Sequence, residues 1–120
     1  MSKTNQRLAR MLSALVISTG LLSAEAIAAD SAVEQGKAIA FDRKKGNCLG
    51  CHAIEGGKLP GTIGPPLIAM KARYPDKAKL RAQIYDATKA NPYTPMPPFG
   101  KHKALSDKEI DLITEFVHTL

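Results

Sequence analysis

Hydrophobic residues recur at helical spacing along much of this chain, whereas no stretch shows a convincing strand pattern. The clearest example lies at the C-terminal end, where Ser106 and Glu109 form a capping box that predicts the start of a helix. The apolar residues that follow recur three or four positions apart: Ile110, Ile113, Phe116, Val117 and Leu120. A second capping box at residues 31–34 predicts a helix over about 32–42.

The middle of the chain predicts two shorter helices separated by loops. The first covers residues 67–73, and the second covers residues 76–88 with Asp76 as its cap. Segments 55–66 and 89–105 are rich in Gly and Pro, so we expect them to be loops. Four or five helices without a strand indicate an all-α fold.

The N-terminal segment has the layout of a secretory signal peptide. Its first part is basic and contains Lys3, Arg7 and Arg10. An apolar run at 11–22 and a small-residue cleavage box at 26–28 follow. The run has 12 residues, whereas a membrane-spanning helix needs ~20. The pattern therefore predicts a cleaved signal peptide at 1–29 and a mature domain at 30–120 in the periplasm, without stable membrane insertion. An uncleaved anchor is the alternative.

The composition suits one small domain that needs help to fill its interior. The 120 residues carry a net charge of +6 but include only three Phe, three Tyr and no Trp. Nucleic-acid binding by stacking on aromatic side chains is therefore not expected. A mature domain of about 91 residues lies near the size at which an apolar core alone gives modest stability. Something other than side chains is expected to fill its centre.

The two cysteines of the chain lie in one motif, Cys48-Leu49-Gly50-Cys51-His52. This C-x-x-C-H pattern is typical of covalent attachment of one haem c. The thiols of Cys48 and Cys51 form thioethers in such a site, and His52 binds the iron as its proximal axial ligand. Three other interpretations are a thioredoxin-like redox pair, a structural disulfide, and a zinc site completed by His102 and His118.

A second axial ligand to the iron is expected from another part of the chain. The candidates are Met70, Met96, His102 and His118. Met96 is favoured because Pro97 follows it and Pro95 precedes it, so its backbone is stiff and less entropy is lost when its thioether is held against iron. Met70 reads as core filling in a helix, His118 as solvent-facing, and His102 as an exposed loop residue.

Together these features resemble a class I cytochrome c. The shared parts are a capped N-terminal helix, C-x-x-C-H at 48–52, Gly-Pro-x-Leu at 64–67, Met-Pro at 96–97 and a C-terminal helix. The resemblance implies four to five helices wrapped around one covalently attached haem. It also implies that the terminal helices cross where Gly36 meets Phe116. The carbonyl of Pro65 would then accept the N–H of the proximal histidine.

The resemblance extends to the SoxX family of sulfur-oxidation cytochromes. It is carried by the blocks at 46–52, 63–67, 70–75 and 96–100. The family implies a periplasmic heterodimer with a larger haem subunit, SoxA, that acts as an L-cysteine S-thiosulfotransferase. This enzyme joins thiosulfate oxidatively to a cysteine of the carrier protein SoxYZ.

In such a complex this chain would carry electrons to a small acceptor cytochrome and would hold no catalytic residue of its own. Two other functions stay open. One is a free-standing electron shuttle. The other is a ligand-binding haem protein, which a His/Met-ligated iron disfavours.

Overall fold

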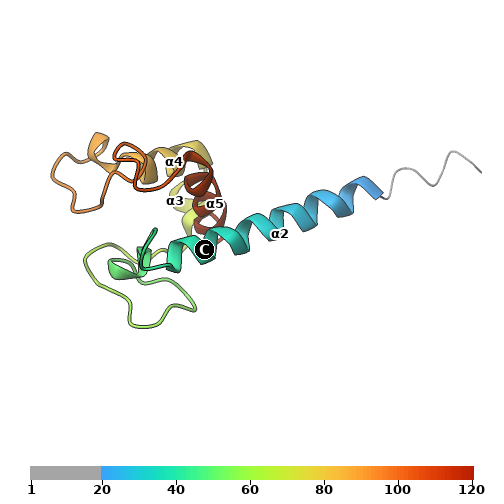
Figure 1. Ribbon diagram of the computed structural model, residues 1–120, viewed down its shortest axis with the longest axis horizontal. Coiled ribbons are helices and arrows are strands. Elements are labelled where there is room, and N and C mark those ends of the chain that lie inside the picture. Colours follow the sequence, from blue (N-terminus) through green and yellow to red (C-terminus); the bar gives the residue numbers. More distant parts are fainter. Residues whose placement is uncertain (1–19) are drawn as a thin grey trace, which may run out of the picture. The chain divides into compact units, whose positions relative to one another are not determined.

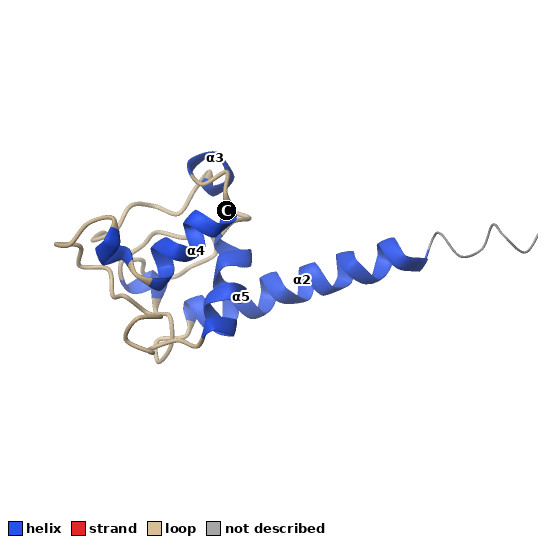
Figure 2. Cartoon of the chain, turned by 90° about the horizontal axis from the view of Figure 1, so that it is seen from above, coloured by secondary structure: helices blue, strands red, loops and turns tan. Residues whose placement is uncertain are grey.

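The computed structural model describes residues 20–120 of the chain (Figure 1). In chain order these residues form α2 (Gly20–Phe41), the 3₁₀ turn η1 (Cys48–Gly50), α3 (Met70–Arg73), α4 (Lys77–Tyr85), the 3₁₀ turn η2 (Ala87–Lys89) and α5 (Asp107–Val117). Figure 2 shows helices and loops but no strand in this part of the chain, so the all-α prediction is confirmed there. No helix within residues 20–120 combines the length and the apolar character that crossing a membrane requires.

The first helix begins earlier than the sequence predicts. Helix α2 begins at Gly20, so the prediction of a start near residue 32 was wrong. Residues 21–30 are rich in Ala and Leu and contain neither Gly nor Pro, so nothing in them interrupts a helix. Ser31 therefore lies inside the helix, where its Oγ accepts a hydrogen bond of 3.0 Å from Gln35 Nε2.

The chain divides into two compact units, Met1–Asp30 and Ser31–Leu120. The predicted signal peptide, residues 1–29, extends over residues 1–19, which lie outside the described part of the chain. The cavity described below and all of its lining side chains belong to the second unit.

Within the second unit, the C-terminal part of α2 packs closely against α5. A β-carbon on Gly36 would overlap the Leu112 carbonyl and lie 3.0 Å from Phe116 Cβ, so only glycine fits at this contact. The rings of Phe41 and Phe116 meet edge to face, with centroids 5.9 Å apart. The approach of Gly36 to Phe116 that the family resemblance implies is therefore present.

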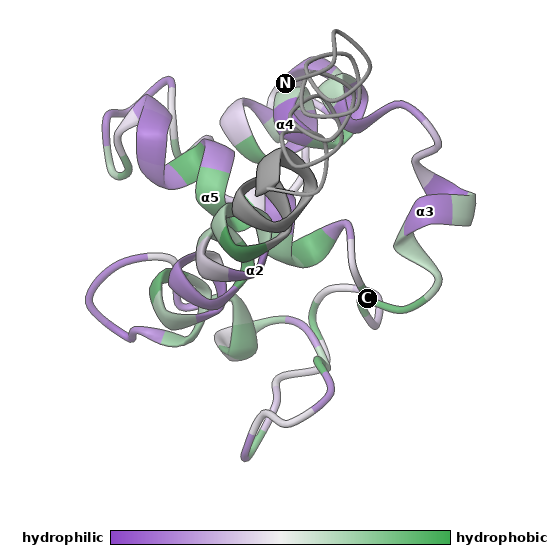
Figure 3. Ribbon diagram, turned by 90° about the vertical axis from the view of Figure 1, so that its right-hand side faces the viewer, coloured by the Kyte–Doolittle hydropathy of each residue, from purple (hydrophilic) through white to green (hydrophobic). Residues whose placement is uncertain are grey.

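Helix α5 has the amphipathic character that its sequence predicts. Ser106 accepts from the backbone N–H of Glu109, and the Glu109 carboxylate accepts from the backbone N–H of Ser106, which completes the capping box. Ile110 and Ile113 are buried on its inner face, and Figure 3 shows hydrophobic and hydrophilic stretches alternating along the helix. On the outer side, Arg81 of α4 binds Asp111 of α5.

The two middle helices are shorter than predicted. Helix α3 covers only Met70–Arg73 because Ala69, directly before it, adopts a left-handed conformation with φ of 51°. Helix α4 begins after the predicted Asp76 cap but ends at Tyr85. The extended backbone of Asp86, with φ of −152°, separates it from η2. In both cases a single residue outside the helical region sets the boundary.

The buried core is small and surrounds the inner faces of α4 and α5. Few large side chains belong to it, as the composition predicts. Its hydrophobic members are Ala40, Ile54, Met70, Leu80, Ile84, Ala87, Leu105, Ile110, Ile113, Phe116 and Val117. Several of them, including Met70, Leu80 and Ile84, also line a large cavity.

Candidate haem-binding site

The cavity has a volume of about 520 Å³, and several of the candidate haem-binding side chains lie in its wall. Cys48, Cys51, His52 and Met96 all line it. Apolar side chains of α4 and of the segments beside it form most of its remaining wall. A cavity of this size that is mostly apolar, with a few placed polar groups, is typical of a cofactor site.

The cysteine motif is held in a tight turn at the edge of the cavity. Asn47 precedes η1 in a left-handed conformation with φ of 46°. The Cys48 carbonyl then accepts from the backbone N–H groups of Cys51, at 3.2 Å, and His52, at 2.9 Å. This turn brings both cysteines and the histidine to the same cavity.

Both thiols are free rather than joined in a disulfide. Burial raises the pKa of the Cys48 thiol to about 11, so in the absence of a cofactor it stays protonated at neutral pH. A redox-active pair of cysteines depends on a lowered thiol pKa. The environment of Cys48 therefore argues against the thioredoxin-like interpretation.

The His52 ring is fixed by its contacts on one side. Its Nδ1 lies 2.7 Å from the carbonyl oxygen of Pro65. A carbonyl can only accept, so Nδ1 donates its hydrogen to Pro65. A β-carbon on Gly64 would lie 2.6 Å from Nδ1, so the absence of a side chain there leaves room for the ring. The contact with Pro65 occupies Nδ1 and leaves Nε2 as the ring nitrogen that could bind a metal ion.

Met96 reaches the same cavity from the proline-rich loop between η2 and α5. Its side chain is half-buried. Its backbone N–H donates to Thr94 Oγ1 at 3.2 Å, and the N–H of Thr94 donates to the carbonyl of Asn91 at 3.1 Å. Two successive turns therefore shape the loop before the methionine. Pro95 and Pro97 on either side limit its backbone further.

The other candidate ligands have different surroundings. Met70 also lines the cavity, but it is only 2% exposed and its Sδ accepts a contact of 3.3 Å from Arg73 Nη1, consistent with core filling. The cavity wall formed by the described residues includes neither His102, which is exposed as predicted, nor His118. His118 is half-buried, so the prediction that it simply faces solvent was wrong. Its Nε2 lies 3.1 Å from the Tyr74 carbonyl because the end of α5 packs against the residue after α3.

The zinc alternative finds no support in the described part of the chain. Among residues 20–120, no group of three or more His, Cys, Asp and Glu side chains is placed to hold a metal ion. A protein zinc site needs three or four such ligands around one point. The candidate completion by His102 and His118 is therefore not assembled in this structure.

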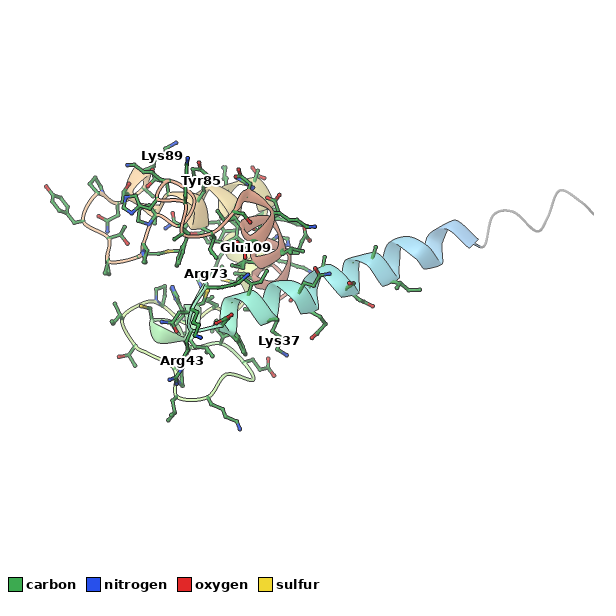
Figure 4. All side chains as sticks on the ribbon, viewed as in Figure 1. Lys37, Arg43, Arg73, Tyr85, Lys89 and Glu109 are labelled. Atoms are coloured by element: carbon green, nitrogen blue, oxygen red, sulfur yellow. The ribbon has the colours of Figure 1, made fainter. Side chains whose placement is uncertain are left out.

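The charged residues that line the cavity are all cationic. Arg43, Lys45 and Arg73 line it, and the described lining includes no Asp or Glu. Arg43 lies two residues after the end of α2, and Arg73 is the last residue of α3; both are labelled in Figure 4. Lys45 also forms an ion pair with Glu109 of α5. Haem carries two propionate carboxylates, so a mainly apolar cavity with a cationic wall fits its chemistry.

Sequence reasoning did not find the cationic wall. Arg43 and Arg73 lie 30 positions apart in the chain. They come to one cavity only because the loop after the cysteine motif returns past it, with Gly61 N bonded to the Leu49 carbonyl and Gly64 N to the Cys51 carbonyl. No local pattern signals such a pairing.

The described residues thus form a small helical domain with a cavity whose lining fits a covalently attached, metal-containing cofactor. The family model for cytochrome c matches residues 33–120, which are most of the chain. The chain therefore belongs to the cytochrome c family, whose members bind haem c covalently, typically one per domain, and transfer electrons. No curated protein matches the sequence with significant similarity.

Proposed function

We propose that this chain is a monohaem cytochrome c with His52 and Met96 as axial ligands. It would act as the electron-transfer subunit of a periplasmic SoxAX complex. The observation that carries the first part is that Cys48, Cys51, His52 and Met96 line the same cavity. When bound, haem c supplies a one-electron couple.

The protein's own part in this function is to hold its ligands still. Pro65 and Gly64 fix the orientation of the His52 ring. The proline-rich loop presents a thioether that can close the other axial position. Ligands that do not move between oxidation states keep the reorganisation on electron transfer small, and an iron closed on both sides favours electron transfer over ligand activation.

The assignment to a SoxAX complex is supported by the sequence blocks that resemble SoxX. Each of them contributes residues to the cavity wall. The block at 46–52 contains the haem motif, and the block at 96–100 contains Met96 and the glycine that follows its loop. In this assignment residues 1–29 direct the chain to the periplasm and are then removed. SoxA would be its stable partner, SoxYZ its transient partner, and a small cytochrome the electron acceptor.

The sulfur chemistry belongs on the partner subunit in this proposal. Conjugating thiosulfate to a cysteine requires a reactive sulfur nucleophile or an open ligand position. Both cysteines of this chain would be consumed as thioethers, and His52 and Met96 would close the iron. The enzyme activity would then be an L-cysteine S-thiosulfotransferase activity to which this chain contributes electron transfer alone.

The mass of the carrier protein tests this division of labour. The holoprotein is incubated with SoxYZ, thiosulfate and an electron acceptor, with and without SoxA. We expect a thiosulfonate adduct only when SoxA is present, and co-purification of the two haem subunits. An adduct formed by this chain alone would place the active site here. Failure to bind SoxA or to support conjugation would instead favour the free-standing shuttle.

A further inference from the structure

The loop that carries Met96 is closed at its base by a set of contacts outside the haem cavity. Tyr85 and Asp86 precede the loop, and Gly100 and Lys101 follow it. These four residues are called the loop neck here. The Tyr85 carbonyl accepts hydrogen bonds from the backbone N–H groups of Gly100, at 3.0 Å, and Lys101, at 3.3 Å. The two ends of the loop are therefore in direct contact.

Asp86 lies inside this neck with a nearly buried carboxylate. Only 5% of the residue is exposed, and carboxylates are rarely so buried unless they are paired. Asp86 Oδ1 accepts from the backbone N–H of Thr88 at 3.2 Å and from the Thr88 hydroxyl. Its Oδ2 lies 3.7 Å from Lys101 Nζ. The Asp86 carboxylate thus binds both the segment that enters the loop, at Thr88, and the segment that leaves it, at Lys101.

The neck is also packed tightly against α4. A β-carbon on Gly100 would overlap the ring of Tyr85, so the ring lies directly against the backbone of the returning chain. The Arg81 guanidinium lies 5.8 Å from the centre of the same ring. In Figure 4, Tyr85 and Lys89 lie in the region of α4 and η2, from which the loop departs. The base of the loop is therefore attached to a helix rather than to another loop.

We propose that Asp86 is a positioning residue for the axial methionine and acts through the loop neck rather than by contact with the cofactor. This inference rests on the proposed ligation by Met96. A thioether binds iron weakly, so its ligation depends on a loop that already holds it in place. Asp86 caps η2, which sets the direction in which the chain enters the loop, and it also binds Lys101 where the chain leaves.

The test follows the weak near-infrared band of Met–Fe(III) ligation in the ferric holoprotein as temperature rises, beside far-ultraviolet circular dichroism. In Asp86→Ala the equilibrium constant for loss of the band should rise roughly fivefold, the usual effect of losing a helix cap. The band should be lost at a lower temperature than the helices. Asp86→Asn keeps an acceptor for Thr88 and should recover part of the effect.

Asp76→Ala is the matched control. Asp76 caps α4 by accepting from Ala78 N at 2.9 Å, away from the neck. It should shift loss of the band and loss of helix together, which is the behaviour of a purely structural cap. If Asp86→Ala also shifts the two transitions together, or shifts neither, the positioning role is wrong.

A second pair of variants keeps the inference testable if Asp86→Ala does not fold. Lys101→Met removes the partner of Asp86 at the neck, and Lys103→Met removes an equal charge from an exposed position two residues further on. Only the first should lower the temperature at which the band is lost. Met96→Ala sets the signal expected without ligation. If the band survives Met96→Ala, the assignment of Met96 as the axial ligand is wrong. If Met96→Ala abolishes the band but Lys101→Met loses it at the same temperature as the unmodified protein, only the positioning role of the loop neck is wrong.

Discussion

The size of the cavity predicts that the protein cannot hold its fold without haem. Replacing Cys48 and Cys51 with Ser and expressing the protein without haem leaves a space of about 520 Å³ inside a small core. At ~24 cal/mol per Å³ of cavity, an empty space of this volume would cost ~12 kcal/mol. The cavity is partly open, so water entry and partial collapse reduce this cost.

Even half of that cost is large compared with the stability available. A domain of about 91 residues is expected to have a free energy of unfolding of ~5–14 kcal/mol in total. We therefore expect the haem-free variant to show little cooperative loss of helix on heating, as measured by far-ultraviolet circular dichroism and calorimetry. Adding haem without covalent attachment should restore a cooperative transition, because it refills the cavity. A sharp two-state transition in the haem-free variant would refute this reasoning.

Three further predictions each concern a single residue. Gly64→Ala places a β-carbon against the His52 ring and should reduce the yield of haem-loaded protein and lower its stability by ~1–3 kcal/mol in thermal melts. Glu109 has its pKa lowered to about 2, first by its hydrogen bond with Lys45, so its stabilising effect is full above its ordinary pKa of 4.5 and is lost as the pH falls toward 2. Glu109→Gln should remove about 1 kcal/mol of this pH-dependent stability in melts from pH 7 to pH 2, because the pair is partly exposed. Arg43→Gln should lower the reduction potential by tens of millivolts in a redox titration, since a nearby cation disfavours the oxidised site.

Matched variants separate these effects from general damage. Gly56→Ala strains a loop glycine with φ of 76° and open space around it, and should leave haem loading unchanged. Glu115→Gln breaks an exposed pair with Lys77 and should not alter the pH dependence in the same way. Lys37→Gln removes a charge outside the cavity wall and should leave the potential nearly unchanged. If a control variant changes haem loading, the pH dependence of stability or the reduction potential as much as its test variant does, the corresponding prediction is wrong.

The features predicted well from sequence are those that depend on neighbouring residues. The capping box at Ser106 and Glu109 and the inner face of α5 form as expected, because each depends on side chains within one or two helical turns. The cysteine motif is equally local, and the structure brings its three residues to one cavity with Met96. Their roles as haem ligands stay predictions.

The features that sequence did not predict depend on the path of the whole chain. The late start of α3 follows from the left-handed backbone of Ala69, which propensity does not favour. The contact of His118 with the Tyr74 carbonyl joins residues 44 positions apart. The meeting of Arg43 and Arg73 at the cavity is another long-range result of loop packing.

The central claim is that His52 and Met96 close the iron on both sides, and X-ray absorption of the ferric holoprotein at the iron edge tests it most directly. We expect one sulfur atom among the atoms bound to iron in the unmodified protein and in Met70→Leu, and none in Met96→Ala. Loss of the sulfur in Met70→Leu, or its survival in Met96→Ala, would contradict the proposed site.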